Sequence, residues 1–152
     1  MKPLETTVEE VLRNAIQSEV KTRVYYQKMA ERAGSPEVRK RLLQLADGEL
    51  IHRARLERRY RETIGQNPPD PQPVTVDIPF DVTNLDMPRA LKLALERERD
   101  AESYFRHMAE RVPDTPLGRL FMELAETEWK HKTDLQAEYD ASGAADRFLM
   151  DL

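Results

Sequence analysis

A carboxylate and an imidazole occur three residues apart at two places in the chain. Glu49 is followed by His52, and Glu128 is followed by His131. Residues at this spacing lie on the same face of an α-helix, so each pair would direct both polar groups toward one point. Carboxylate oxygens and imidazole nitrogens are ligands that iron and manganese accept in proteins. Each pair therefore predicts part of a metal site, provided that the surrounding segment is helical.

A second glutamate stands thirty residues before each of these pairs. Glu19 precedes Glu49, and Glu98 precedes Glu128 at the same separation. A lone Glu-x-x-His motif on a charged helix usually lies in solvent and carries no chemistry. Two copies, each with a further glutamate at the same distance, favour a metal site over that interpretation. The candidate metal ligands are Glu19, Glu49, His52, Glu98, Glu128 and His131.

The two motifs belong to a longer internal repeat. Residues 15–60 align with residues 94–139 without a gap, and thirteen of the 46 aligned pairs are identical. The identical pairs include every candidate ligand, which shared helical composition alone would not produce. The repeat predicts two similar helical hairpins packed about a pseudo-twofold axis.

Four helices are needed to position these ligands. Apolar residues recur in steps of three and four, and the candidate ligands lie on these largely apolar stripes. Thr7, Ser35 and Thr115 are suited to N-cap positions, and Ser142-Gly143 is suited to ending the last helix. We therefore predict an all-α fold in which hairpin one spans residues 7–63 and hairpin two spans residues 88–141.

The connection between the hairpins, residues 64–87, has a different composition. A connection of this length is typical of a crossover that runs the length of a four-helix bundle. Residues 142–152 would then form a tail or short helix, docked on the bundle or on a neighbouring subunit, and the whole chain, 1–152, would be a single domain. A long helix in the crossover is excluded by Pro68, Pro69, Pro71, Pro73 and Pro79.

The predicted bundle gathers acidic side chains in one layer. Each glutamate pair is centred on the turn of its hairpin, so antiparallel helices would place all four carboxylates at about one height. Ionised carboxylates in an apolar core are costly unless they are protonated or bind cations. Two divalent ions would balance four carboxylates and leave two neutral imidazoles as nitrogen donors. Such a mixed set favours iron or manganese over calcium or zinc.

Composition excludes several other classes of protein. The chain has 152 residues, a formal net charge of −4 and no basic stripe, which argues against nucleic-acid binding. Because cysteine is absent, disulfides, iron–sulfur clusters and thiolate-bound metals are excluded. No signal-like segment or apolar run of membrane-spanning length is present, so we expect a cytoplasmic protein without a membrane partner.

Two further groups of residues receive a structural interpretation. The charged series from Glu96 to Glu102 is typical of a solvated helix face. Aromatic residues near the predicted metals could assist redox chemistry, but packing in the core is the favoured interpretation. These aromatic residues are Tyr25, Tyr26, Tyr104 and Phe105.

At these positions the sequence resembles the rubrerythrin branch of the ferritin-like superfamily, over roughly residues 7–141. The resemblance rests on Ala15-to-Glu19 followed by Tyr25-Tyr26, on Ala94-to-Glu98 followed by Tyr104-Phe105, and on the two Glu-x-x-His motifs. It implies a ferritin-like four-helix bundle that holds two iron ions, with manganese as a possible replacement. By the same resemblance, Glu49 and Glu128 would bridge the two metals. Glu19 with His52 would complete one metal, and Glu98 with His131 would complete the other.

The chain departs from the rubrerythrin pattern at two points. Full rubrerythrins carry a cysteine-ligated rubredoxin domain that supplies electrons, whereas this chain has no cysteine. Rubrerythrins also have an additional glutamate three residues beyond the third-helix ligand. That position is Ala101 in this chain, and Glu102 stands one residue further on.

The resemblance implies a non-haem di-iron oxidoreductase that reduces peroxide or dioxygen with electrons from an external donor. The protein would form a homodimer or a higher homo-oligomer. Three alternatives stay open: a ferroxidase or iron-handling protein with ferrous iron as its substrate, a di-manganese catalase-like protein, and a helical-bundle module without catalytic activity.

Overall fold

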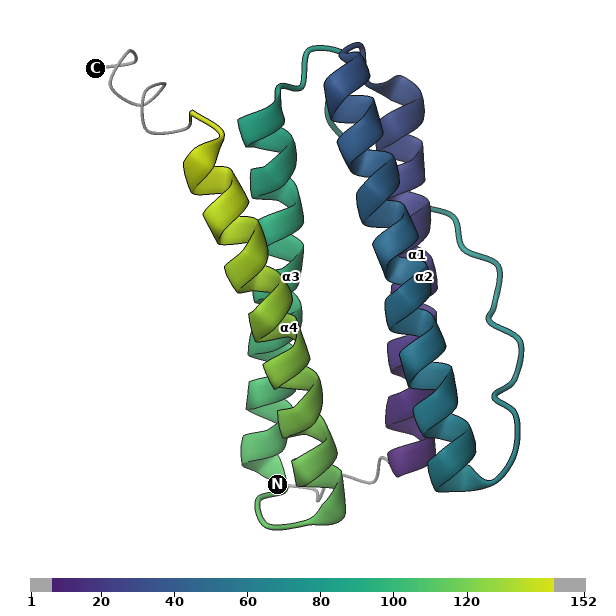
Figure 1. Cartoon of the computed structure of the whole chain (residues 1–152). Helices are drawn as coiled ribbons and strands as arrows, with labels where there is room; N and C mark the ends of the chain where they lie inside the picture. Colours follow the sequence, from purple (N-terminus) through teal and green to yellow (C-terminus); the bar gives the residue numbers. More distant parts are fainter. Residues whose placement is uncertain (1–6, 144–152) are drawn as a thin grey trace. The chain divides into compact units, whose positions relative to one another are not determined.

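The computed structural model describes residues 7–143, which form four long α-helices in two antiparallel pairs (Figure 1). Hairpin one consists of α1 (Val8–Arg32) and α2 (Pro36–Ile64), and hairpin two consists of α3 (Met87–Arg111) and α4 (Pro116–Ala141). Each hairpin belongs to its own compact unit, and the division falls between Leu85 and Asp86. The described part of the chain contains no strand. The predicted all-α fold with two repeated hairpins is confirmed.

The helices begin where side chains can bind their free backbone N–H groups. Thr7, Ser35 and Thr115 each accept a hydrogen bond from a first-turn N–H, at 3.2, 3.3 and 3.0 Å respectively. These three predicted N-caps are confirmed, and Ser142 caps the end of α4 as expected. Asp86 caps α3 in the same way and was not anticipated, so α3 begins at Met87.

Two glycines lie where a neighbouring backbone segment leaves no space for a Cβ atom: Gly34 between α1 and α2, and Gly118 in the first turn of α4. The Gly34 N–H donates to the Thr83 carbonyl oxygen at 3.2 Å, and a Cβ atom on Gly34 would lie only 2.5 Å from that oxygen. A Cβ atom on Gly118 would clash with the carbonyl oxygen of Val112. Both positions therefore favour glycine, because any side chain would meet backbone atoms of a neighbouring segment.

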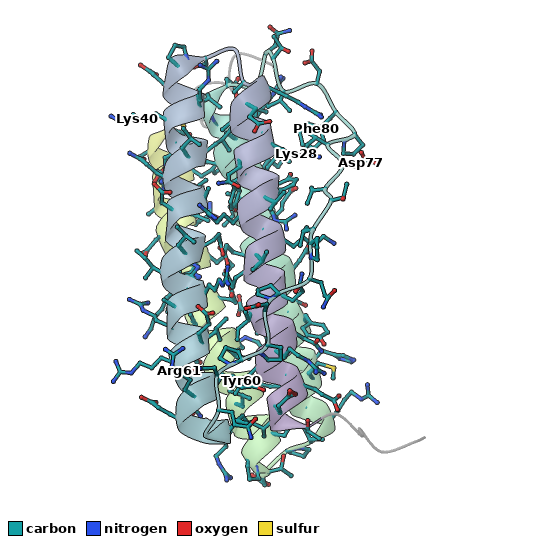
Figure 2. The ribbon with its side chains drawn as sticks, turned by 90° about the vertical axis from the view of Figure 1, so that its right-hand side faces the viewer. Lys28, Lys40, Tyr60, Arg61, Asp77 and Phe80 are labelled. Carbon is teal, nitrogen blue, oxygen red and sulfur yellow. The ribbon has the colours of Figure 1, made fainter. Side chains whose placement is uncertain are left out.

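Residues 65–86 form neither helix nor strand, and they run along α1 toward the turn of hairpin one (Figure 2). The Gln17 side-chain amide donates to the Gln72 carbonyl at 3.0 Å and accepts from the Gln72 N–H at 2.8 Å. Further along, the Lys28 Nζ donates to the Val76 carbonyl at 2.7 Å. The predicted crossover is thus held along α1, with buried apolar side chains at Val76, Ile78, Val82 and Leu85.

The predicted apolar stripes are buried in the core. Leu12, Met29 and Leu42 have no exposed surface, and Leu91 and Phe121 are 1% exposed. No helix within residues 7–143 carries the long apolar run that crossing a bilayer requires. The tail predicted for residues 142–152 lies outside the described residues from position 144 onward.

One aromatic residue departs from the predicted core packing. Tyr25 and Tyr26 are buried, whereas Tyr104, the repeat equivalent of Tyr25, is 56% exposed and packs edge-on against the ring of Phe105. The prediction that Tyr104 packs in the core is wrong. One physical difference is that the crossover lies along α1 (Figure 2) and belongs to the same compact unit as hairpin one.

The two helix-associated glycines of hairpin one should respond oppositely to substitution. Gly34→Ala forces a methyl group against the Thr83 carbonyl, so we expect the free energy of unfolding to fall by about 1–3 kcal/mol. Gly48 lies inside α2, and a Cβ atom added there would have nothing within 4 Å, so Gly48→Ala should raise stability by up to about 1 kcal/mol. Urea unfolding followed by circular dichroism measures both changes, and equal effects of the two substitutions would contradict this account.

Candidate metal centre

Hairpin one brings together Glu19 from α1 with Glu49 and His52 from α2. The His52 Nδ1 atom lies 3.6 Å from Glu19 Oε2 and 3.4 Å from Glu49 Oε2. One ligand atom from each of the three residues lies within 4.8 Å of the other two. Glu49 is buried, and the other two side chains are mostly covered. We call these three residues the first ligand set.

Hairpin two repeats this arrangement with Glu98 from α3 and with Glu128 and His131 from α4. The His131 Nδ1 atom lies 3.6 Å from Glu98 Oε2 and 3.5 Å from Glu128 Oε2. The three ligand atoms again lie within 4.8 Å of one another, and both glutamates are buried. These residues are the second ligand set. Two copies that match this closely in both distances show that the internal repeat extends to the positions of individual side-chain atoms.

The antiparallel hairpin explains why each set converges. The two helices of a hairpin leave a turn of a few residues in opposite directions, so positions at equal distance from the turn lie at one height. Glu19 and Glu49 both lie near the middle of their helices, as do Glu98 and Glu128. The imidazole then joins the set because it stands three residues after the glutamate on the same helix face.

The donor chemistry of each set fits a divalent transition-metal ion. Two carboxylate oxygens and one imidazole nitrogen are suitable ligands for iron or manganese. Metal–ligand bonds of about 2.1 Å would place neighbouring donor atoms roughly 3 Å apart, close to the 3.4 and 3.5 Å between imidazole and carboxylate in the two Glu-x-x-His motifs. All six sequence-derived candidates therefore lie in these two sets. The predicted single layer of all six residues stays a prediction, and the third histidine, His107, is exposed and outside both sets.

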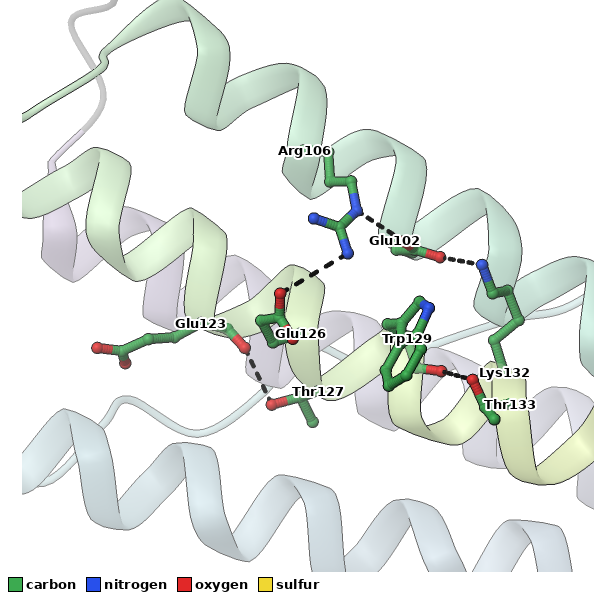
Figure 3. Close-up of polar contacts among 8 residues, drawn as sticks. All are labelled: Glu102, Arg106, Glu123, Glu126, Thr127, Trp129, Lys132 and Thr133. Carbon is green, nitrogen blue, oxygen red and sulfur yellow. Dashed lines mark hydrogen bonds and ion pairs between the residues drawn. The ribbon is translucent and has the colours of Figure 1, made fainter.

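A cluster of ion pairs surrounds the buried Glu102 (Figure 3), which stands one helical turn after Glu98 on α3. Glu102 is 8% exposed, and its carboxylate accepts hydrogen bonds from Lys132 Nζ at 2.5 Å and from Arg106 Nε at 2.6 Å. The Arg106 guanidinium also lies 3.9 Å from Glu126. The bond from Lys132 lowers the pKa of Glu102, and the bond from Arg106 adds to this effect against the opposing influence of burial.

The prediction of a solvated face from Glu96 to Glu102 is therefore wrong at Glu102. A sequence signal was present, because Glu102 stands four residues after Glu98 and so lies on the same face of the helix. Its main partner, Lys132, lies on a different helix and thirty residues further along the chain. The pattern of charges along one helix does not predict such a contact. The hydrogen bonds to Lys132 and Arg106 compensate for burying this carboxylate.

Comparisons with known proteins agree with this geometry. The sequence model of the rubrerythrin family matches residues 10–139. A solved structure of a hypothetical protein from Pyrococcus furiosus is similar, with a TM-score of 0.56 and 26% sequence identity. That similarity covers 92% of this chain and 95% of the Pyrococcus chain. No curated protein sequence gives a significant match.

Substitution of Glu102 should make the free energy of unfolding of the metal-free protein less dependent on pH in acidic solution. The pKa of Glu102 lies below its ordinary value of 4.5 in the folded protein, so its ion pairs stabilise the fold above that value. This contribution is lost as the pH falls through the lowered pKa. We expect Glu102→Gln to cost roughly 1 kcal/mol at pH 7, because Lys132 and Arg106 remain partly exposed.

The difference between the parent protein and Glu102→Gln should narrow below about pH 4, where the parent carboxyl also becomes neutral. Urea unfolding at a series of pH values measures this difference. Glu110→Gln, at an exposed position on α3, is a matched control that should show little effect at either pH. A loss of stability for Glu102→Gln that stays constant down to pH 2 would contradict the assigned ion pairs.

Proposed function

The chain belongs to the rubrerythrin family, a ferritin-like family of di-iron carboxylate proteins, and we propose that it binds two iron ions and uses them to reduce hydrogen peroxide or dioxygen. The single observation that carries this proposal is the pair of matching Glu/Glu/His sets. A helical module that had lost its metals would have no physical reason to keep two buried carboxylate–imidazole clusters of the same geometry.

The residues that would hold iron follow from the two sets. Glu19, Glu49 and His52 would supply ligands on hairpin one, and Glu98, Glu128 and His131 would supply ligands on hairpin two. In each set the Nδ1 atom of the imidazole faces the carboxylate oxygens, so Nδ1 would be the ligand nitrogen. A neutral imidazole that binds through Nδ1 carries its proton on Nε2. The Nε2–H group would then donate a hydrogen bond to a protein acceptor or to water.

When bound, two ferrous ions would supply the two electrons that break the O–O bond of one hydrogen peroxide molecule, and two protons would complete two molecules of water. The chain's own residues control access and charge around this reaction. The buried carboxylates of Glu49, Glu98 and Glu128 would place negative charge beside bound iron, which would favour the more highly charged ferric state. The surrounding apolar stripes limit the entry of water, which strengthens these electrostatic effects.

A further cycle would need an electron donor other than a cysteine-ligated iron centre within residues 1–152. Rubredoxin-type iron and iron–sulfur clusters require cysteine ligands, and the chain has no cysteine. We propose that an external protein or a small reductant restores the ferrous state. The substrate would be a small oxidant, because only a small molecule reaches ligands that are this well covered.

Iron binding should be stoichiometric and should depend on both ligand sets. We expect the metal-free protein to bind two ferrous ions per chain anaerobically, and the Glu49→Ala, Glu128→Ala double variant to bind none tightly. Bound iron should raise the melting temperature of the parent protein, because a ligand at a hundred times its dissociation constant stabilises the folded state by about 2.7 kcal/mol. Iron analysis after desalting and thermal unfolding with and without iron measure these effects.

The exposed His107 provides a matched control for histidine loss. His107→Ala should keep two irons per chain and the full rise in melting temperature. A double variant that is stabilised by iron as strongly as the parent would show that the two sets are not the metal site, and the non-catalytic interpretation would then be preferred.

The reaction with peroxide separates the proposed activity from its rivals. We expect the di-ferrous protein to consume one equivalent of hydrogen peroxide, to become ferric without releasing dioxygen, and to turn over when a reductant is supplied. Mössbauer spectroscopy follows the iron, and an oxygen electrode follows the gas. Oxygen release by the manganese-loaded protein would indicate a catalase, and continued uptake of iron beyond two ions per chain would indicate a ferroxidase or iron-handling protein.

A further inference from the structure

The ion pair between Glu102 and Lys132 joins the two helices of hairpin two beside the second ligand set. Glu102 follows Glu98 by one helical turn on α3, and Lys132 follows His131 directly on α4. The Lys132 Nζ and Glu102 Oε1 atoms are 2.5 Å apart, and a second cation, Arg106, holds the other carboxylate oxygen (Figure 3). We call the ion pair of Glu102 and Lys132 the brace, because it fixes the separation of α3 and α4 close to Glu98 and His131.

The repeat-equivalent positions in hairpin one cannot form the same brace. Arg23 aligns with Glu102, and Arg53 aligns with Lys132. Two guanidinium groups repel each other, and Arg53 contacts Glu57 on its own helix at 3.6 Å instead. The two hairpins therefore share the ligand residues and their geometry, but they differ in the residues that support the ligands.

We propose that Glu102 and Lys132 are positioning residues that make the second ligand set the tighter of the two metal positions. This inference rests on the proposed function, because it assumes that both ligand sets bind metal. Residues that orient metal ligands without touching the ion commonly change metal affinity by about 10–100-fold when substituted. The second set holds its helices at a fixed separation before metal arrives, so less ordering is needed when the ion binds.

At the two aligned positions, hairpin one carries two positive charges, and hairpin two carries one negative and one positive charge. Glu57 beside Arg53 and Arg106 beside Glu102 offset this difference in net charge. The inference therefore rests on the contact between the two helices of hairpin two and not on net charge. The lowered pKa of Glu102 keeps this carboxylate ionised throughout the neutral range.

Single-set variants of the full-length protein test the proposal directly. His52→Ala leaves the second set intact, and His131→Ala leaves the first set intact. Titration of each metal-free variant with Co²⁺, followed by calorimetry and by the visible absorption of the bound ion, gives one dissociation constant for each set. We expect the second set to bind about tenfold more tightly. Trp129, the one tryptophan of the chain, lies next to Glu128. Because the second set should fill first, the first equivalent of Co²⁺ should quench the fluorescence of Trp129 in the unsubstituted protein.

Substitutions of the brace distinguish positioning from a general structural role. Glu102→Gln and Lys132→Met should each weaken Co²⁺ binding about tenfold in the His52→Ala background and leave binding unchanged in the His131→Ala background. Lys132→Arg keeps the positive charge and should restore most of the affinity. Arg23→Glu would create an ion pair with Arg53 and should tighten binding in the His131→Ala background. Circular dichroism confirms that each variant is folded.

The outcomes separate the inference from the proposed function. Equal affinities of the two sets that do not respond to Glu102→Gln or Lys132→Met would overturn the inference and leave the metal site standing. An equal loss of affinity in both backgrounds would also overturn it, because it would reveal a general effect on stability. Failure of the unsubstituted protein to bind Co²⁺ and iron at either set would overturn the proposed function itself.

Discussion

Burial of negative charge among apolar helices is the constraint on which the rest of this structure depends. Within residues 7–143, the buried charged side chains are Glu49, Glu98, Glu102 and Glu128. A carboxylate in such a place costs several kcal/mol unless a positive charge or hydrogen-bond donors compensate for it. Glu102 meets this demand within its own hairpin, through two cationic side chains. The other three lie against imidazoles, which carry charge only when protonated. One molecule thus shows two arrangements around buried carboxylates: an internal ion pair at Glu102, and two Glu/Glu/His groups that could hold a metal ion.

The turns control the ligand sets from a distance of several helical turns. A shift of one residue in either helix would rotate a ligand by about 100° away from its partners and move it by about 1.5 Å along the axis. Ser35 and Thr115 fix the first residue of α2 and of α4. The backbone contacts at Gly34 and Gly118 leave no space for a different path. Short turns with little freedom are therefore what allow long helices to present carboxylates and imidazoles in register.

Local and repeated signals made most of this arrangement predictable from sequence. The helix ends followed from capping residues, and the six candidate ligands followed from a spacing that occurs twice, which separates a site from the many charged residues around it. Glu102 escaped detection because its repeat equivalent, Arg23, has the opposite charge and its partner Lys132 is remote in sequence. The exposure of Tyr104 is not predictable from its helix for a related reason. Whether a helix face is covered depends on other segments of the chain, which the sequence of the helix does not specify. The internal repeat thus predicts the residues that the two hairpins share, but it does not predict the positions at which they differ.

The crossover belongs to hairpin one, since Gln17, Lys28 and Gly34 tie it to α1 and to the adjoining turn. The division between the compact units falls after this segment, at Leu85. A break in the backbone at that point would interrupt none of these hydrogen bonds and would leave a complete Glu/Glu/His set on each fragment. Of all positions between the hairpins, this junction is therefore the one at which a two-fragment version or a circular permutant would keep both halves of the molecule whole.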